Sequence, residues 1–208
     1  MEFCEVYMRR NFIFLLFLIS SLNSFSQITF WNLSSWEHFK IAVEYTKVSE
    51  NYLNYAYVDM AKGYSDNENT SYYQFIREQK IYKNWYAHIE SKGDIGFNWN
   101  STYVGLAYLI AFKSGYVALE PLFQINDFDK VGGQFSCVGG VESKRFEISW
   151  FNDLSYVNTC TNYTEVRLWF KINEKLEQVM RPGMVFCETI TKGGIHTPAV
   201  FLGLKFFI

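Results

Sequence analysis

The sequence ends in a segment with strictly alternating character, Thr197 to Ile208. Every second residue from Val200 to Ile208 is apolar, whereas the opposite face includes Gly203 and Lys205. A period of two residues is typical of a β-strand whose two faces have different surroundings. So long and apolar a strand at the edge of an open sheet would invite aggregation, whereas pairing of the last strand with the first closes a barrel and removes the edge. We therefore expect a closed β-barrel.

The same segment resembles the C-terminal signal by which outer-membrane barrels are recognised for assembly. Gly203, Phe206 and Ile208 fit this signal, and Phe201 stands where a polar residue is usual. The resemblance implies that the barrel-assembly machinery is a partner of this chain, through its C-terminal strand.

The first residues have the organisation of an export signal. Two Arg residues precede the apolar run 12–19, and small residues follow at the positions expected for cleavage after Ser26. The run is too short to cross a bilayer as a helix, which needs about 20 apolar residues. We predict a signal peptide over residues 1–26, with Met8 as a possible alternative start. Since no later segment is long and apolar enough for a transmembrane helix, membrane residence would require a barrel over residues 27–208.

Composition excludes some other classes of function. Aromatic residues make up 20% of the chain and Pro occurs 3 times, which favours strands. The net charge of -2 gives no basic surface for nucleic acid, so no nucleic-acid partner is predicted. Cys137, Cys160 and Cys187 form no CxxC pair, and the His residues are scattered, so we predict no metal site and no cofactor. These Cys residues are expected to be small apolar fillers.

Alternation and turn residues together predict twelve strands in an all-β, closed, antiparallel transmembrane barrel. The predicted strands span residues 27–34, 38–47, 52–60, 71–80, 84–91, 101–112, 115–125, 131–141, 145–157, 162–172, 177–190 and 197–208. Pro121 and Pro182 fall inside strands, where each removes a hydrogen-bond donor, so bulges or breaks are expected there.

The predicted connections alternate in length. Those after even-numbered strands are short, and most of those after odd-numbered strands are longer and rich in Gly, Asn and Asp. Outer-membrane barrels have short periplasmic turns, longer extracellular loops and an even number of strands. This pattern predicts a multi-pass barrel in the outer membrane of a Gram-negative cell, with outer-membrane lipid around it. Periodicity alone does not tell which face is inside, so a secreted barrel of lipocalin type, with its apolar face inward, stays an alternative.

Several runs resemble a known family. They are residues 55–60, 73–80, 87–90 and 203–206. The chain resembles the uncharacterised outer-membrane barrels known as domain of unknown function 5020, which are related to Tsx-like nucleoside-specific channels. This resemblance implies a twelve-stranded barrel for passive uptake of nucleosides or similar small solutes.

If the apolar face meets lipid, the polar face lines the lumen. The candidate lumen and ligand-binding residues are Tyr55, Tyr57, Asp59, Gln74, Glu78, Lys80, His88, Glu90, Glu165, Arg167, Trp169 and Lys205. Aromatic rings among them could stack on a base, and the polar groups could bond to sugar hydroxyls. Twelve strands enclose a narrow interior, so the same charges could instead pair across a closed lumen and serve structure alone.

An enzyme acting on lipid is the alternative from another class. His88 and Glu90 share a strand face, but a catalytic His needs a nucleophile within reach. The sequence has no GxSxG-like elbow. We therefore do not predict an enzyme.

Overall fold

The computed structural model describes residues 26–35, 38–63, 69–95, 99–126, 130–157, 160–173, 175–192, 194–195 and 199–207. The strands are β1 (Ser26–Ser34), β2 (His38–Val48), β3 (Tyr52–Gly63), β4 (Asn69–Tyr82), β5 (Trp85–Gly93), β6 (Asn100–Phe112), β7 (Gly115–Asn126), β8 (Lys130–Glu142), β9 (Phe146–Tyr156), β10 (Cys160–Phe170), β11 (Met180–Thr191), β12 (Gly194–Ile195) and β13 (Ala199–Phe207). No helix among these residues is long and apolar enough to cross a membrane.

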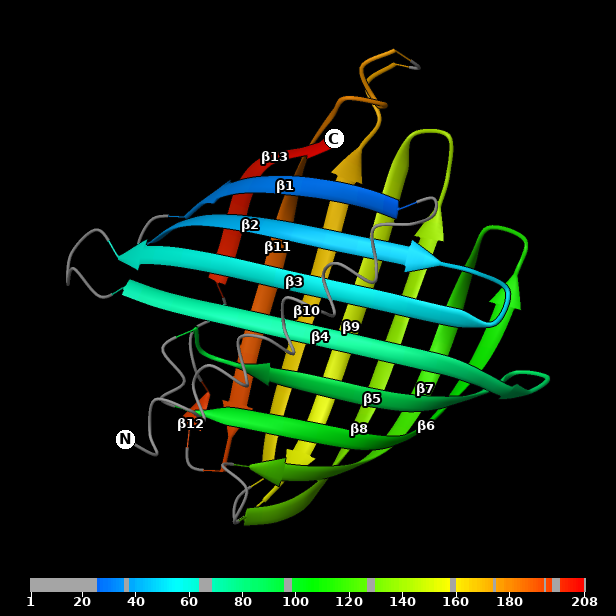
Figure 1. Ribbon diagram of the computed structural model, residues 1–208. Coiled ribbons are helices and arrows are strands. Elements are labelled where there is room, and N and C mark those ends of the chain that lie inside the picture. Colours follow the sequence, from blue (N-terminus) through cyan, green and yellow to red (C-terminus); the bar gives the residue numbers. More distant parts are fainter. Residues whose placement is uncertain are drawn as a thin grey trace, which may run out of the picture.

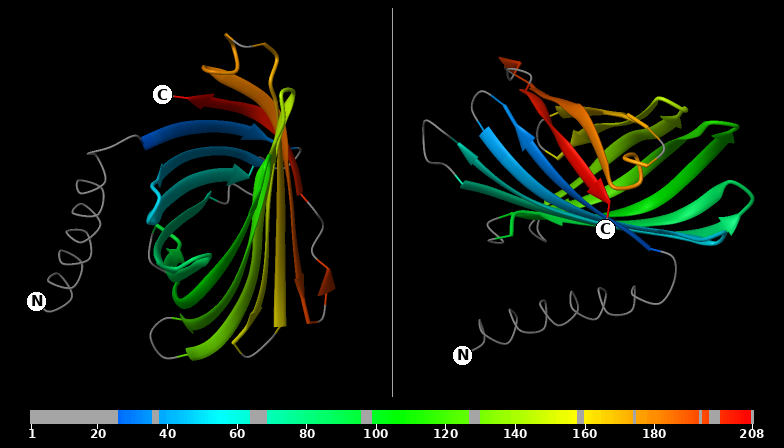
Figure 2. Two further views of the ribbon diagram at one scale, coloured as in Figure 1. Left: turned by 90° about the vertical axis from the view of Figure 1, so that its right-hand side faces the viewer. Right: turned by 90° about the horizontal axis from the view of Figure 1, so that it is seen from above.

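The sheet closes on itself. Each strand from β1 to β11 pairs antiparallel with the next, and β13 pairs with both β11 and β1. The two-residue β12 only extends the β11 hairpin. The twelve long strands therefore form a closed antiparallel barrel, which confirms the predicted fold class. In Figure 1 the front wall, β1 to β4, and the rear wall, β8 to β10, run in different directions, as strand tilt in a small barrel requires. Figure 2 shows β13 beside β1.

The two ends of the barrel differ. We call one end the short-turn end; its connections include residues 49–51, 83–84, 113–114 and 143–145. The other is the loop end, with residues 35–37, 64–68, 94–99, 127–129 and 157–159. Ser26 pairs with Lys47 and Phe207 pairs with Thr29, so β1 starts and β13 finishes at the short-turn end.

Apolar and polar side chains are divided between the two faces of the wall as in a membrane barrel. Exposed apolar side chains stand on the outer face; they include Ile41, Val43, Ile89, Val104, Leu106, Phe123, Phe135, Leu154, Val200 and Leu202. Buried polar side chains point inward; they include Asp59, His88, Glu90, Glu120, Gln124, Asp153, Glu165, Arg167 and Lys205. A lipocalin-like arrangement would have the opposite polarity. The barrel therefore has an apolar exterior and a charged lumen, as transmembrane barrels do.

The predicted strand bounds agree with the structure to within three residues. β3 continues to Gly63, three residues beyond its predicted end, and β11 begins at Met180 and not at residue 177. The Asn173 side-chain oxygen accepts hydrogen bonds from the backbone N–H of Lys175 and Leu176, and the Met180 N–H donates to the Leu176 carbonyl at 2.7 Å. An Asn side chain that bonds its own backbone a few residues on favours a turn over a strand. The connection 171–179 is accordingly long, and the alternation of loop lengths is less regular than predicted.

Both prolines interrupt a ladder, as predicted. In the β6–β7 ladder, Gly105 pairs with Leu122 and Tyr108 pairs with Leu119, in the same register. Between them, residues 106–107 are not paired with residues 120–121. The β10–β11 ladder stops at Trp169 and Gly183, next to Pro182. In each case the opposite neighbouring strand stays paired, because the missing N–H affects only one side.

Two facing glycines make room inside the barrel. Gly183 in β11 pairs with Gly203 in β13. A Cβ atom at Gly183 would overlap the Trp169 ring, and one at Gly203 would overlap the Asn32 carbonyl. The absence of side chains at these two positions lets the strands and the Trp169 indole approach closely.

Some predictions fall at the margins of the described residues. The predicted signal peptide lies outside them apart from Ser26, and Ile208 lies outside them too, so the export and assembly signals stay predictions. The three cysteines among the described residues, Cys137, Cys160 and Cys187, are free. Cys137 and Cys187 are half-buried as expected for fillers, whereas Cys160 is exposed at the loop end, so the filler prediction is wrong for this residue.

The assignment of faces can be tested with one substitution at two neighbouring positions of β4. Phe75 lies on the outer face, and Gln74 faces the lumen beside Glu90. We expect Phe75→Arg to reduce the amount of folded barrel in membranes strongly, because an Arg facing lipid at mid-depth costs about 2–4 kcal/mol. Gln74→Arg should be tolerated, because the new cation meets the Glu90 carboxylate. The measurement is the heat-dependent shift in gel migration of membrane fractions; equal losses for the two variants would contradict the assignment.

Candidate functional site: the barrel lumen

An aromatic cluster fills one side of the lumen at mid-height. Trp31 of β1 packs its ring 5.4 Å from that of Trp169 in β10 and 5.6 Å from that of Tyr57 in β3. Trp31 and Trp169 are almost completely buried. Since β1 and β10 are not neighbours in the sheet, the two indoles meet inside the barrel and not along its wall.

Arg167 links walls that lie far apart in the sequence. From β10 its guanidinium reaches Glu44 of β2 at 3.3 Å and also pairs with Glu165 on its own strand. The guanidinium lies 4.5 Å from the centre of the Trp31 ring and 5.1 Å from that of Phe151. Bidentate reach and stacking on aromatic faces are properties that suit Arg to this position.

Lys92 makes a second connection across the lumen. Its ammonium, carried by β5, lies 3.0 Å from Asp153 of β9 and 3.5 Å from Glu90. Gln74 donates a hydrogen bond to Glu90 at 2.7 Å. The ammonium also lies 4.4 Å from the centre of the Tyr103 ring. Each charge in this group therefore has a partner of the opposite sign.

A third ion-pair group lies toward the short-turn end. Lys205 of β13 lies 3.1 Å from Glu147 of β9, and Arg181 of β11 pairs with the same carboxylate. Lys205 and Arg167 both point inward, as the sequence predicts.

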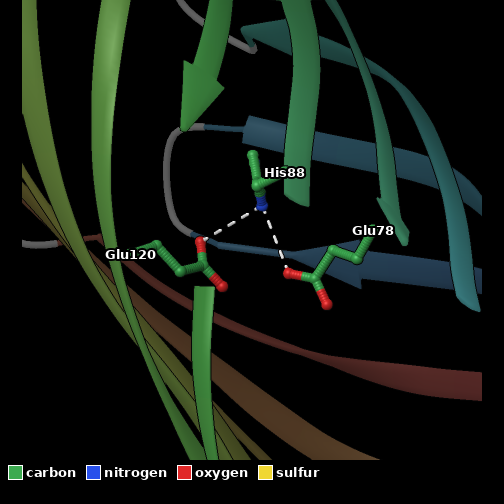
Figure 3. A group of neighbouring side chains, drawn as sticks. All are labelled: Glu78, His88 and Glu120. Carbon is green, nitrogen blue, oxygen red and sulfur yellow. Dashed lines mark hydrogen bonds and ion pairs between the residues drawn. The ribbon is translucent and has the colours of Figure 1, made fainter. Parts of the chain in front are cut away.

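His88 lies in a separate acidic environment. Its Nδ1 is 3.2 Å from Glu78 and 3.8 Å from Glu120, and its Nε2 is 3.6 Å from Glu90. Figure 3 shows the imidazole between the carboxylates of Glu78 and Glu120. The His88 side chain is 1% exposed.

The lumen widens toward the loop end into a cavity of about 560 Å³, which we call the upper cavity. Its aromatic walls are Tyr57, Tyr72, Trp99, Tyr103, Phe151 and Tyr163. Its charged side chains are Lys40, Asp59, Lys92, Asp153, Glu165 and Arg167. A smaller cavity of about 420 Å³, the lower cavity, lies at the short-turn end and includes Tyr116, Gly140 and Glu147 among its lining residues.

The structure divides the predicted site residues into groups. Five line the upper cavity: Tyr57, Asp59, Gln74, Glu165 and Arg167. Glu78, His88 and Glu90 form the acidic group below it. The other four are placed less favourably for a solute. Tyr55 donates to Glu44, Trp169 lies inside the aromatic cluster, Lys205 pairs with Glu147, and Lys80 is exposed at the short-turn end of β4.

Sequence reasoning did not select most of the aromatic residues in the upper cavity. Tyr72, Trp99, Tyr103, Phe151 and Tyr163 are absent from the predicted set although all line the cavity. Tyr103 was detectable, because it alternates with the outward Val104 in a clearly patterned strand. Tyr72 was not, because Tyr73 follows it and both faces of the strand then carry the same residue type.

Solved structures share this fold at low sequence identity. The NanC porin has a TM-score of 0.59 at 9% identity, with 88% of this chain and 100% of the porin covered. The KdgM porin has a TM-score of 0.56 at 10% identity, with 86% and 98% covered, and it is also known in complex with disordered oligogalacturonate. An outer-membrane channel from Pseudomonas putida F1 has a TM-score of 0.50 at 7% identity, with 88% and 94% covered.

A scan against protein-family models found no match, and neither did a search of the curated proteins. The resemblance to domain of unknown function 5020 and to Tsx-like channels therefore stays a prediction, as does any solute. The similarity to these porins is a similarity of fold. With a closed twelve-stranded wall, an apolar exterior and a charged lumen, the chain is a porin-like, multi-pass β-barrel of the outer membrane.

Proposed function

We propose that this barrel is a narrow channel for passive uptake of nucleosides or similar small neutral solutes. The observation that supports it best is the upper cavity, which combines six aromatic rings with fully paired charges at the loop end of the lumen. Its volume of about 560 Å³ falls within the range of about 300–1,000 Å³ that is usual for small-molecule sites.

The charges of the upper cavity favour a neutral solute. Three cations face three anions, and each cation has a partner: Lys40 lies 2.8 Å from Asp59, Lys92 lies 3.0 Å from Asp153, and Arg167 pairs with Glu165. A charged solute would have to compete with one of these pairs, and separating a buried pair is costly. A neutral solute can bind while all three pairs stay intact.

The upper cavity offers aromatic rings on which a base can stack and one hydrogen-bond acceptor for a sugar hydroxyl. Trp99 is half exposed at the rim, with its ring 6.2 Å from that of Tyr72. Stacking of a base on an aromatic ring contributes about 1–3 kcal/mol. The side-chain oxygen of Gln124 is buried without a hydrogen-bond partner in the described part of the protein, so it is available to a hydroxyl donor. These groups replace Tyr55 and Trp169 as our candidates for contact with the solute.

Passage must continue from the upper to the lower cavity. The cross-lumen pairs of Lys92 and Arg167 line the upper cavity, and these two cations are carried on long, rotatable stems. Several weak sites in series allow a solute to enter without being trapped, which is the requirement for conduction.

A closed structural barrel is the second candidate, and the contacts across the lumen favour it. The indoles of Trp31 and Trp169 meet inside the barrel, and Arg167 reaches Glu44 on a distant strand. His88 was the candidate catalytic residue of an enzyme acting on lipid. Its side chain is buried in the lumen and faces carboxylates, away from the lipid, so it does not support that function.

Planar-bilayer recording distinguishes a channel from a closed barrel. We expect small single-channel currents that a nucleoside such as uridine partly blocks. Trp99→Ala should weaken the block by about 5- to 150-fold, since one stacking contact is lost. Trp85→Ala is the matched control, because Trp85 is equally exposed, at 41% against 42% for Trp99, but stands on the outer face at the opposite end. Absence of any current from folded protein would favour the closed barrel, and equal effects of the two variants would contradict the site.

The neutrality of the upper cavity gives a second prediction. Uridine should block the current at a concentration at least about tenfold lower than uridine monophosphate does, because the phosphate has to compete with an existing ion pair. The measurement is a blocking titration with both compounds at one ionic strength. A tighter block by the monophosphate would show that the cavity selects anions.

A further inference from the structure

A group of metal-ligand side chains lies in the lumen wall outside the upper cavity. Glu78 of β4, His88 of β5 and Glu120 of β7 point toward one another (Figure 3). One ligand atom from each, two carboxylate oxygens and His88 Nδ1, lies within 4.8 Å of the other two. All three side chains are largely removed from solvent, with exposed fractions of 16%, 1% and 8%.

The hydrogen bonds in this group are incomplete. Nδ1 of His88 carries at most one proton, yet two carboxylates approach it, at 3.2 Å from Glu78 and at 3.8 Å from Glu120. On the other side of the ring, Nε2 is buried with no hydrogen-bond partner among the described residues, since Glu90 stands 3.6 Å away. A buried imidazole nitrogen without a partner is costly. With an ion on Nδ1, the ring proton would lie on Nε2 and face the Glu90 carboxylate, as the second nitrogen of a metal-bound His usually does.

The negative charges of Glu78 and Glu120 also have too few cationic partners. Glu90 is neutralised by Lys92 and bonded by Gln74. Among the described residues, His88 is the only cation within ion-pair distance of Glu78 or Glu120; Lys80, two residues along β4, pairs with neither. When both carboxylates are ionised, even a protonated His88 leaves one negative charge uncompensated in a poorly hydrated site. Buried carboxylates of this kind are paired, bind metal or take up a proton.

The distances fit a coordination polyhedron. Zinc binds nitrogen at about 2.0–2.1 Å and carboxylate oxygen at about 2.0–2.2 Å, so two ligands of a tetrahedral ion lie about 3.3–3.5 Å apart. The separations of 3.2 and 3.8 Å from Nδ1 are close to this edge length, and the two carboxylate oxygens lie within 4.8 Å of each other, so a carboxylate has to turn slightly inward to complete the site. The backbone of Glu120 is unpaired on the β6 side, next to Pro121, and paired with Ser136 on the β8 side.

We propose that Glu78, His88 and Glu120 bind one divalent transition-metal ion, with zinc as the representative. Nδ1 of His88 and one oxygen from each carboxylate are the three protein ligands, and the fourth position is open to water. The imidazole ligand favours zinc and its neighbours over magnesium and calcium, which prefer oxygen alone. The ion supplies the positive charge that the two carboxylates lack and ties β4, β5 and β7 together.

The site also lies between the two cavities. On β7, Glu120 stands midway between Tyr116, which lines the lower cavity, and Gln124, which lines the upper one. A bound ion would therefore stand on the lumen wall at a height between these two cavities. Metal binding itself does not rest on the proposed transport function.

The test is zinc binding by the folded barrel. The exposed thiol is first removed with Cys160→Ser, so that it does not bind zinc, and the detergent-purified protein is stripped with a chelator. Calorimetric titration with zinc chloride, together with metal analysis after gel filtration, should give about one ion per barrel. We expect Glu120→Gln and His88→Gln each to weaken binding by at least about tenfold, and magnesium not to compete.

Glu147→Gln is the matched control. It removes another lumen carboxylate, one that already has two cationic partners, and it should bind zinc as the parent does. The migration of unheated samples on gels verifies that each variant is folded, and Glu78→Gln replaces any variant that is not. The proposal is overturned if the folded parent retains no zinc, or if the cluster variants bind it as tightly as Glu147→Gln does.

Discussion

The pairing of β1 with β13 is the interaction on which the rest of this structure depends. Hydrocarbon offers no partners for backbone N–H and C=O groups, so a sheet can stand in a membrane only if it has no free edge. Six consecutive pairs, from Thr29 with Phe207 to Ser34 with Leu202, remove that edge. The number of strands, twelve, then sets the diameter of the barrel. The diameter decides which side chains from opposite walls come into contact inside it.

Because the lumen is narrow, its charges meet across it. Arg167, Lys92 and Lys205 each reach a carboxylate on a strand that is not their neighbour. Such pairs hold opposite walls together, and in the proposed channel they would also decide which solute passes without displacing them. The aromatic cluster around Trp169 closes one side of the lumen, so the space that remains is gathered at the two ends.

The fold could be predicted from the sequence because alternation by two residues divides each strand into an apolar and a polar face; the structure then shows that the apolar face is the outer one. In the last strand, Lys205 and Phe201 point inward and Leu202 outward, as the pattern of apolar residues requires. The start of β11 was predicted three residues too early because Asn173 stabilises a local turn that alternation does not detect. The turn shortens the strand from its N-terminal end.

The candidate site was predictable only in part. Alternation tells that Arg167 faces the lumen, but its contact with Glu44, 123 residues away, depends on the register with which the barrel closes. The group around His88 depends on the pairing of Glu78 with His88 and, separately, on how deep β7 places Glu120. The His residues are scattered in the sequence, so no spacing motif announces this group. Alternation also does not show which way a Tyr side chain points, because Tyr occurs on both the lipid-facing and the lumen-facing side of such a wall.

The two prolines give the barrel wall an uneven stiffness. From β1 to β5 each ladder runs without a missing pair except at the bulge near Lys80. Pro121 leaves a gap between β6 and β7, and Pro182 ends the contact between β10 and β11 early. Changes in cross-section should therefore occur by bending at these two seams while the front wall keeps its shape. Any such change would start on the side of β6, β7, β10 and β11, and Glu120 and Trp169, which lie beside the seams, would move first.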